Sequence, residues 1–172
     1  MRGIVKGALL SGIILGVALA GCSQKVAEPD VKEAIAVMNP TEGSKVRGAV
    51  SFVKDGKGVR ITANIEGLSP GPHGFHIHEF GNCTSPEANS AGGHFNPTDM
   101  PHAGPKAEKR HAGDLGNLEA DKNGLARLEV TDNIISLEVA KSVIGRRLVH
   151  CQQSYDMLQG IVTQAKAGVQ CF

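Results

Sequence analysis

The chain has 172 residues, enough for one ordinary domain once its N-terminal segment is set apart. Its formal net charge of +1 gives no sign of the basic surface that nucleic-acid-binding proteins need, so nucleic acid is excluded as a partner. Aromatic residues make up 3% of the chain and tryptophan is absent, so the core has to be built mainly from Val, Ile, Leu and Ala.

The first 21 residues are typical of a signal peptide rather than of folded structure. A positively charged start precedes an apolar run from Ala8 to Ala20, which is too short for a membrane-spanning helix. The run ends in Leu19-Ala20-Gly21-Cys22, which resembles a bacterial lipobox. The resemblance implies cleavage before Cys22 and lipidation of that residue, whereas a plain secretory peptide with a chance cysteine is the alternative.

Residues 22–33 are polar and are predicted to be a lipidated tether between the membrane and the domain. Stable anchoring requires more than one acyl chain, which lipoprotein modification supplies. Ser23 favours the outer membrane, so we expect the protein to lie in the periplasm with a bacterial membrane as a partner. That compartment is oxidising, so disulfides can persist there.

Residues 34–172 are predicted to form one all-β domain. Apolar residues such as Ile61, Ala63 and Ile65 alternate with polar ones, and Asn123-Gly124 is a strong hairpin signal. Many short strands separated by turns predict a sandwich or barrel. The expected strands are Ala34–Met38, Lys45–Lys54, Gly58–Glu66, Gly74–Phe80, Leu115–Ala120, Leu125–Thr131, Ile134–Glu138 and Arg147–His150.

Two long segments, Cys83–Gly113 and Cys151–Gly168, are predicted to be loops. Loops of this length in a compact domain are usually functional or disordered. The first is rich in Gly, Pro, Asn and His and contains residues that bind metals, so we expect it to be functional.

Six potential metal ligands fall in or beside the first loop, and zinc and copper favour such imidazole and carboxylate groups. Taken singly, each of the six fits an ordinary surface or turn residue, but five of the seven histidines in so short a stretch indicate a common role. Gly92-Gly93 is expected to permit close backbone approach, and His73 is interpreted as a turn residue. The six are His76, His78, His94, His102, His111 and Asp114.

His76 and His78 lie two residues apart in a predicted strand, so both should point to the same face of the sheet. Phe75 and Ile77 alternate with them and are expected to face the core. Two histidines on one face of a stiff strand form a preorganised chelate.

The segments GPHGFHIHEFGNC, AGGHFNP, RHAGDLGN and GRRLVH resemble the copper/zinc superoxide dismutase family, over roughly residues 34–150. The resemblance is to the periplasmic lipoprotein type of this family. It implies an eight-stranded Greek-key β-barrel, an immunoglobulin-like sandwich, with long metal-binding and electrostatic-type loops.

The resemblance also implies copper and zinc as cofactors and superoxide as substrate. Alternate reduction and oxidation of copper would convert superoxide to oxygen and hydrogen peroxide, with His94 as the catalytic residue that bridges both metals. The implied copper ligands are His76, His78, His94 and His150. The implied zinc ligands are His94, His102, His111 and Asp114.

Beyond His150 the chain departs from the family, so residues 151–172 form a divergent tail. The family has an aspartate there that orients copper and zinc histidines, and Asp156 is the candidate for that role. The arginine that guides superoxide is absent, and the nearest cation is Lys166. Substrate capture is therefore expected to be slower than in the family.

The resemblance implies a disulfide between Cys83 and Cys171, with Cys151 as the competitor for either partner. A copper- or zinc-binding lipoprotein with little or no turnover is the main functional alternative. A zinc hydrolase is disfavoured, because Asp114 as fourth zinc ligand leaves no open position. Monomer and homodimer both stay open.

Overall fold

The computed structural model describes residues 30–40, 43–82, 89–138, 140–151 and 158–164. Within that part, no helix is long and apolar enough to cross a membrane. The described strands are β1 (Glu33–Pro40), β2 (Arg47–Asp55), β3 (Gly58–Glu66), β4 (Gly71–Ile77), β5 (Asp114–Ala120), β6 (Ala126–Asp132), β7 (Arg147–Cys151) and β8 (Leu158–Gln164), and a short 3-10 helix, η1, covers Asn89–Ala91.

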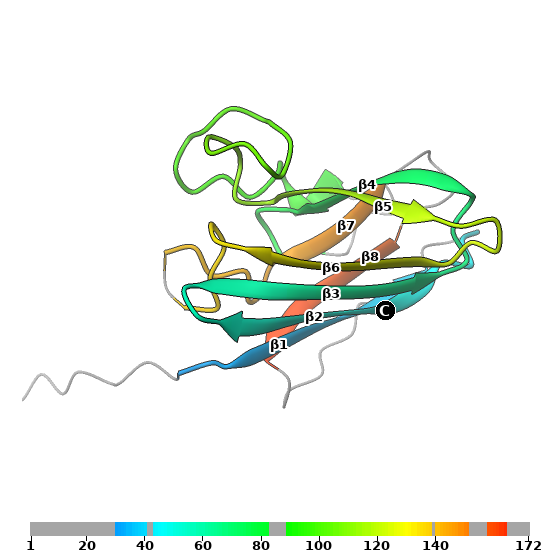
Figure 1. Cartoon of the computed structure of the whole chain (residues 1–172), viewed down its shortest axis with the longest axis horizontal. Helices are drawn as coiled ribbons and strands as arrows, with labels where there is room; N and C mark the ends of the chain where they lie inside the picture. Colours follow the sequence, from blue (N-terminus) through cyan, green and yellow to red (C-terminus); the bar gives the residue numbers. More distant parts are fainter. Residues whose placement is uncertain (1–29, 41–42, 83–88, 139, 152–157, 165–172) are drawn as a thin grey trace, which may run out of the picture.

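The strands close into an antiparallel barrel in the order β1-β2-β3-β6-β5-β4-β7-β8, with β8 returning to β1 (Figure 1). The prediction of an all-β barrel is therefore confirmed. The ladder is unequal around the barrel. Strands β2 and β3 pair along their whole length, whereas β5 and β6 are joined by the single pair Ala120↔Ala126.

Alternation along the strands follows the sequence pattern. In β3, Ile61, Ala63 and Ile65 are all buried in the core, as predicted. In β4, Phe75 and Ile77 are fully buried. The intervening side chains therefore point to the other face of the sheet, where the long loop covers them.

The strand predicted at Ile134–Glu138 is wrong, because this segment forms bends. Asp132, the last residue of β6, accepts hydrogen bonds at Oδ1 from the backbone N–H groups of Ile134 (2.8 Å) and Ile135 (3.0 Å). A carboxylate that takes up these donors offers the backbone an alternative to a sheet ladder. The chain therefore turns where its apolar residues suggested a strand.

The loop predicted at Cys151–Gly168 is also wrong in part, because Leu158–Gln164 forms β8 between β1 and β7. Strand propensity depends strongly on neighbours, and here two partners supply a ladder on both sides. His73 is likewise no turn residue. It lies in β4, fully buried, with its Nε2 atom 2.6 Å from the carbonyl oxygen of Ser69.

A buried ion pair ties the long loop before β5 to the end of β6. The guanidinium of Arg110 contacts the carboxylate of Asp132, and their side chains are 2% and 6% exposed. Arg110 also donates from Nε to the carbonyl of Pro105 (3.2 Å) and from Nη1 to that of His111 (2.9 Å). One side chain thus holds two points of the loop and one strand end.

We expect Asp132→Ala to lower the free energy of unfolding by about 3–5 kcal/mol, since it leaves the Arg110 charge buried and uncompensated. The matched control is Glu66→Ala, which removes the exposed partner of Arg47 and should cost less than about 1 kcal/mol. Urea unfolding of both variants measures the difference. Equal losses would show that burial of the Arg110–Asp132 pair does not matter.

Candidate metal centre

Three backbone hydrogen bonds join the end of β4 to two segments of the long loop. Ile77 N donates to Gly113 O (2.9 Å), Phe95 N donates to Ile77 O (2.8 Å), and Gly113 N donates to Phe95 O (2.9 Å). Each of these residues lies next to one or more of the predicted ligands. This backbone triangle therefore brings together ligands that are far apart in sequence.

One glycine makes this close approach possible, and a second permits a close contact nearby. A Cβ atom on Gly113 would lie 2.1 Å from the carbonyl oxygen of Ile77, so only glycine fits there. Gly92 has φ of 74°, and a Cβ on it would lie 2.8 Å from the ring of Phe80. Gly93 has open space around it, so the expectation of close approach at Gly92-Gly93 is correct for Gly92 alone.

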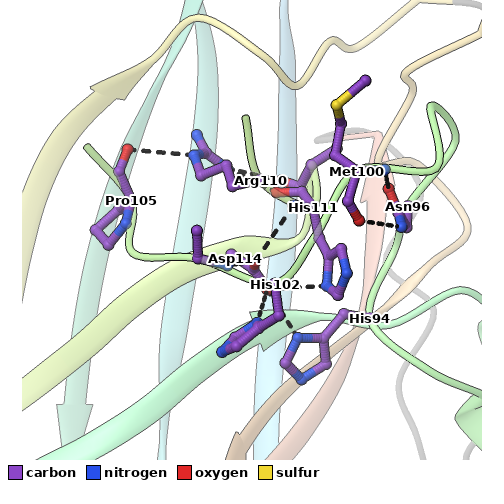
Figure 2. Close-up of polar contacts among 10 residues, drawn as sticks. His94, Asn96, Met100, His102, Pro105, Arg110, His111 and Asp114 are labelled. Atoms are coloured by element: carbon purple, nitrogen blue, oxygen red, sulfur yellow. Dashed lines mark hydrogen bonds and ion pairs between the residues drawn. The ribbon is translucent and has the colours of Figure 1, made fainter. Parts of the chain in front are cut away.

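The cluster predicted to bind zinc is assembled in the structure (Figure 2). The Oδ1 atom of Asp114 lies 2.7 Å from His94 Nδ1, 3.0 Å from His102 Nδ1 and 3.4 Å from His111 Nδ1. Its Oδ2 atom instead accepts the backbone N–H groups of Ala103 (3.1 Å) and His111 (3.2 Å). The carboxylate thus has one oxygen fixed by the loop and the other turned toward three imidazoles.

The spacing and chemistry of these four groups are compatible with a bound metal. In a tetrahedral site with bonds of 2.0–2.1 Å, neighbouring ligand atoms are about 3.3 Å apart. The Nδ1 atom of His111 is buried and has no hydrogen-bond partner, which is uncommon for a polar atom inside a protein. Three imidazoles and one carboxylate fit zinc well.

Electrostatics keeps Asp114 ready to bind a cation. Burial alone would raise the pKa of its carboxyl. Hydrogen bonds from the backbone of Ala103 and from the rings of His94 and His102 outweigh burial, so the pKa of Asp114 lies below its ordinary value. The carboxylate therefore stays ionised, the form that a metal requires.

Within the loop, Asn96 braces the chain between His94 and His102. Its side-chain nitrogen donates to Met100 O (2.8 Å), and its side-chain oxygen accepts from Met100 N (2.9 Å) (Figure 2). This two-bond turn fixes the path of the chain from one histidine to the next.

His76 and His78 lie beside His94, and the ring centroid of His76 is also 6.2 Å from that of His102. The ring of His94 stacks on that of His76 with centroids 4.1 Å apart, and its centroid is 5.3 Å from that of His78. The Nδ1 atom of His78 is 2.8 Å from Gly92 O. A carbonyl only accepts, so His78 carries its proton on Nδ1 and keeps the Nε2 lone pair for a ligand.

Burial also keeps this histidine pair neutral. Burial, with a smaller effect from His94, lowers the pKa of His76 to about 4. Burial lowers the pKa of His78 as well. The hydrogen bond to Gly92 opposes that shift, and the charges of His94 and Arg147 add to it. Neutral imidazole is the form that binds metals.

Arg147 is a buried charged residue beside the site that the sequence did not single out. It is fully buried, and its Nη1 atom donates to Asn82 O (2.6 Å) and lies 3.3 Å from Ser90 Oγ. It therefore links Asn82 to Ser90. Arg147 precedes Leu148 in the predicted strand Arg147–His150, so alternation puts the two side chains on opposite faces. This alternation is a sequence signal that could have identified Arg147.

Arg146 is the other cation near the site. Its guanidinium lies 3.5 Å from the centre of the Phe95 ring, and Nη1 donates to Glu79 O (2.6 Å). Together with His94, it lines a cavity of about 250 Å³. Glu79 also lines this cavity, so its wall carries both a positive and a negative side chain.

Several predicted site residues are described only in part or not at all. His150 and Cys151 belong to β7, where the structure describes their backbone alone. Four others, with the cation Lys166, lie outside the described residues: Cys22, Cys83, Asp156 and Cys171.

Comparisons with known proteins agree with this geometry. A family model described as "Copper/zinc superoxide dismutase (SODC)" matches residues 46–171. Among 208 matching chains of known structure is one titled "Crystal Structure Analysis of the clock protein EA4". It is 31% identical with a TM-score of 0.72, and the match covers 79% of this chain and 96% of that one.

Replacing Gly113 with alanine should disrupt the centre, because the new Cβ collides with the backbone of Ile77. We expect Gly113→Ala to lower the free energy of unfolding by about 1–3 kcal/mol and to weaken zinc binding. Gly104→Ala, in the same loop, meets nothing within 4 Å and is the control. Chemical unfolding and zinc titration compare the two. Identical behaviour would mean that the backbone triangle tolerates an added methyl group.

In the metal-free protein, the ring of His76 should titrate with a midpoint near pH 4 rather than near 6.5. Because the unfolded chain takes up this proton first, the folded state loses stability as the pH falls from about 6.5 to about 4. NMR of the histidine ring protons measures the midpoint directly. A value near 6.5 would contradict the burial described for this side chain.

Proposed function

This chain belongs to the copper/zinc superoxide dismutase family, and from that premise we propose that it converts superoxide into oxygen and hydrogen peroxide. One observation carries the proposal. The ring of His94 has its Nδ1 atom 2.7 Å from Asp114 Oδ1, while its face stacks on His76. One imidazole therefore belongs to two neighbouring clusters, as a group shared by two metals must.

The metal assignment follows from the donor sets. The proposed zinc ligands are His94, His102, His111 and Asp114, a closed set of four that suits a structural ion. The proposed copper ligands with described side chains are His76, His78 and His94. Bound copper supplies the one-electron oxidation of one superoxide and the one-electron reduction of another.

The protein's own groups then control proton transfer and geometry. With Nδ1 of His94 taken up by a zinc ion beside Asp114, Nε2 would be the atom of that ring that can hold a proton and pass it to the reduced product. The hydrogen bond from His78 to Gly92 O fixes the tautomer and orientation of that ring. Burial keeps His76 unprotonated above about pH 4.

Access for the substrate is proposed along the cavity that Arg146 shares with His94. A positive charge beside the site attracts superoxide, which is an anion, and electrostatic guidance of this kind is an established property of the family. Arg146 is half-buried and bonded to backbone carbonyls, so it guides from a fixed position. We expect it to compensate only in part for the arginine that the tail lacks.

Other features of the proposal rest on the sequence. They are the signal peptide at residues 1–21, the lipid anchor on Cys22, the periplasmic location at the outer membrane and a disulfide between Cys83 and Cys171. The strand order, with β6 between β3 and β5, supports the eight-stranded Greek-key connection that the resemblance implies. The domain would then extend over residues 34–172.

A metal-binding lipoprotein with little turnover is the second candidate. The observation in its favour is the tail at residues 151–172, which departs from the family and lacks its guiding arginine. Loss of the family's aspartate that orients the copper and zinc histidines would weaken copper binding by about 10–100-fold. Such a protein would bind zinc in the four-ligand cluster and hold copper poorly.

The full-length chain, loaded with copper and zinc, should accelerate superoxide decay well beyond the same protein loaded with zinc alone. Pulse radiolysis measures the decay, and elemental analysis measures both metals. Zinc without copper, together with background decay, would favour the metal-binding alternative. Both metals bound with background decay would reject the enzyme.

The zinc assignment has its own test. We expect Asp114→Ala to weaken zinc binding by at least about 10-fold, since it removes an ionised ligand. Glu108→Ala removes an exposed carboxylate from the same loop and should leave zinc binding unchanged. Competition with a zinc chelator measures both affinities. Unchanged binding in the Asp114 variant would place the zinc elsewhere.

A further inference from the structure

The proposed copper-type site has three described imidazoles, and the fourth ligand is expected from β7. Strand geometry indicates which residue of β7 can supply it. In an antiparallel pair, residues directly opposite each other lie on the same face, and successive residues alternate between faces. The inference below rests on the proposed function, because it concerns the ligands of that same site.

The pairing of β4 with β7 puts position 150, the expected ligand His150, on the opposite face of the sheet from the histidines His76 and His78. His150 is opposite Phe75, and Leu148 is opposite Ile77. Phe75 and Ile77 are the fully buried core residues of β4. Position 150 therefore belongs to the face of the sheet that packs in the barrel interior, whereas His76 is opposite Val149.

The described side chains of β7 support this alternation. Leu148 belongs to the hydrophobic core cluster, but Val149, although fully buried, does not. Arg147, one step earlier, extends to Asn82 O and Ser90 Oγ, away from the core, and its carbonyl accepts from His78 N (2.7 Å). Odd-numbered positions of β7 therefore lie on the face of the copper-type histidines.

The next odd-numbered position is Cys151. It is opposite Gly74, which has no side chain to occupy the space, and it is diagonal to His76. Diagonal neighbours in a sheet are about 7–8 Å apart, within reach of a shared ion with bonds of about 2.0–2.3 Å. The register of β4 against β7 is continuous from Gly74 to Ile77, so the alternation of faces holds up to Cys151.

We propose that Cys151, and not His150, is the residue of β7 that completes the copper-type site. The ion would be held by one thiolate and by the imidazoles of His76, His78 and His94. The thiol gives up its proton on binding. Soft thiolate ligands select Cu(I), so this ligand set would favour the reduced ion and slow turnover.

The assignment also divides the cysteines of the mature chain. With Cys151 taken up by the metal, Cys83 and Cys171 are left as the pair for a disulfide. Competition between Cys151 and Cys171 for Cys83 then depends on metal supply. A chain that meets no metal after export can form the other pairing.

Cobalt(II) tests the ligand set without redox chemistry. The full-length chain is reduced, given one equivalent of zinc to fill the four-ligand cluster, and titrated with cobalt(II). A thiolate bound to cobalt produces an intense charge-transfer band in the near ultraviolet, which imidazole and carboxylate ligands do not. We expect the band in the natural sequence and in His150→Val, and its loss in Cys151→Ser.

Two further variants guard against loss of folding. Cys171→Ser is the matched control in the same tail and should keep the band. Cys151→His should still bind cobalt beside the zinc, but without the band, and its affinity for cobalt should lie within about 10-fold of that of the natural sequence. Both results support Cys151 as the ligand.

A failure of this inference can be told apart from a failure of the proposed function. Cobalt that binds to the natural sequence without the band, or a band that survives in Cys151→Ser, overturns the role of Cys151 and leaves the proposed function intact. Loss of cobalt binding in His150→Val, with zinc binding retained, also overturns that role and restores His150 as the ligand. If the natural sequence binds no second ion at all, both the copper site and this inference are wrong.

Discussion

The centre depends on three backbone hydrogen bonds among Ile77, Phe95 and Gly113. Each contributes only about 1 kcal/mol to stability, but together they fix where a strand and two parts of a long loop meet. Ligands that are up to 38 positions apart in the sequence, from His76 to Asp114, then come within reach of one another. The bonds require a residue without a side chain at position 113, so one glycine sets the geometry of the whole cluster.

Three arginines, two of them buried, extend this constraint to the rest of the loops. Arg110 fixes the loop to β6, Arg146 fixes the segment after β4, and Arg147 joins residues 82 and 90. A guanidinium has several donors in a rigid plane, so a single side chain can satisfy several backbone carbonyls at once. The irregular segments are therefore held by these hydrogen bonds as well as by packing of residues such as Phe95 and Ala112 in the core. The result is a preorganised set of ligands on otherwise irregular chain.

The sequence alone predicted β3 to its end residues and the inward face of β4, because both follow strict period-two alternation. It also predicted the cluster around Asp114, since histidines that lie so close together in the sequence indicate a shared ligand role. The sequence-based prediction failed where the local structure depends on groups that are distant in the sequence. The bends after β6 depend on the carboxylate of Asp132, and β8 depends on two neighbouring strands. The face occupied by His150 depends on the register of β7 against β4, which no local pattern contains.

The boundary between β5 and β6, here called the seam, links the metal cluster to the stability of the barrel. These strands share one pair at the hairpin end, and at the other end the Arg110–Asp132 contact joins them through the loop. An ion bound by the loop would therefore also help to hold β5 against β6. Chains that lose it would expose unpaired amide edges along the opened seam, where strands of neighbouring molecules can add. We therefore expect the solubility of such a protein to fall when the metal is removed.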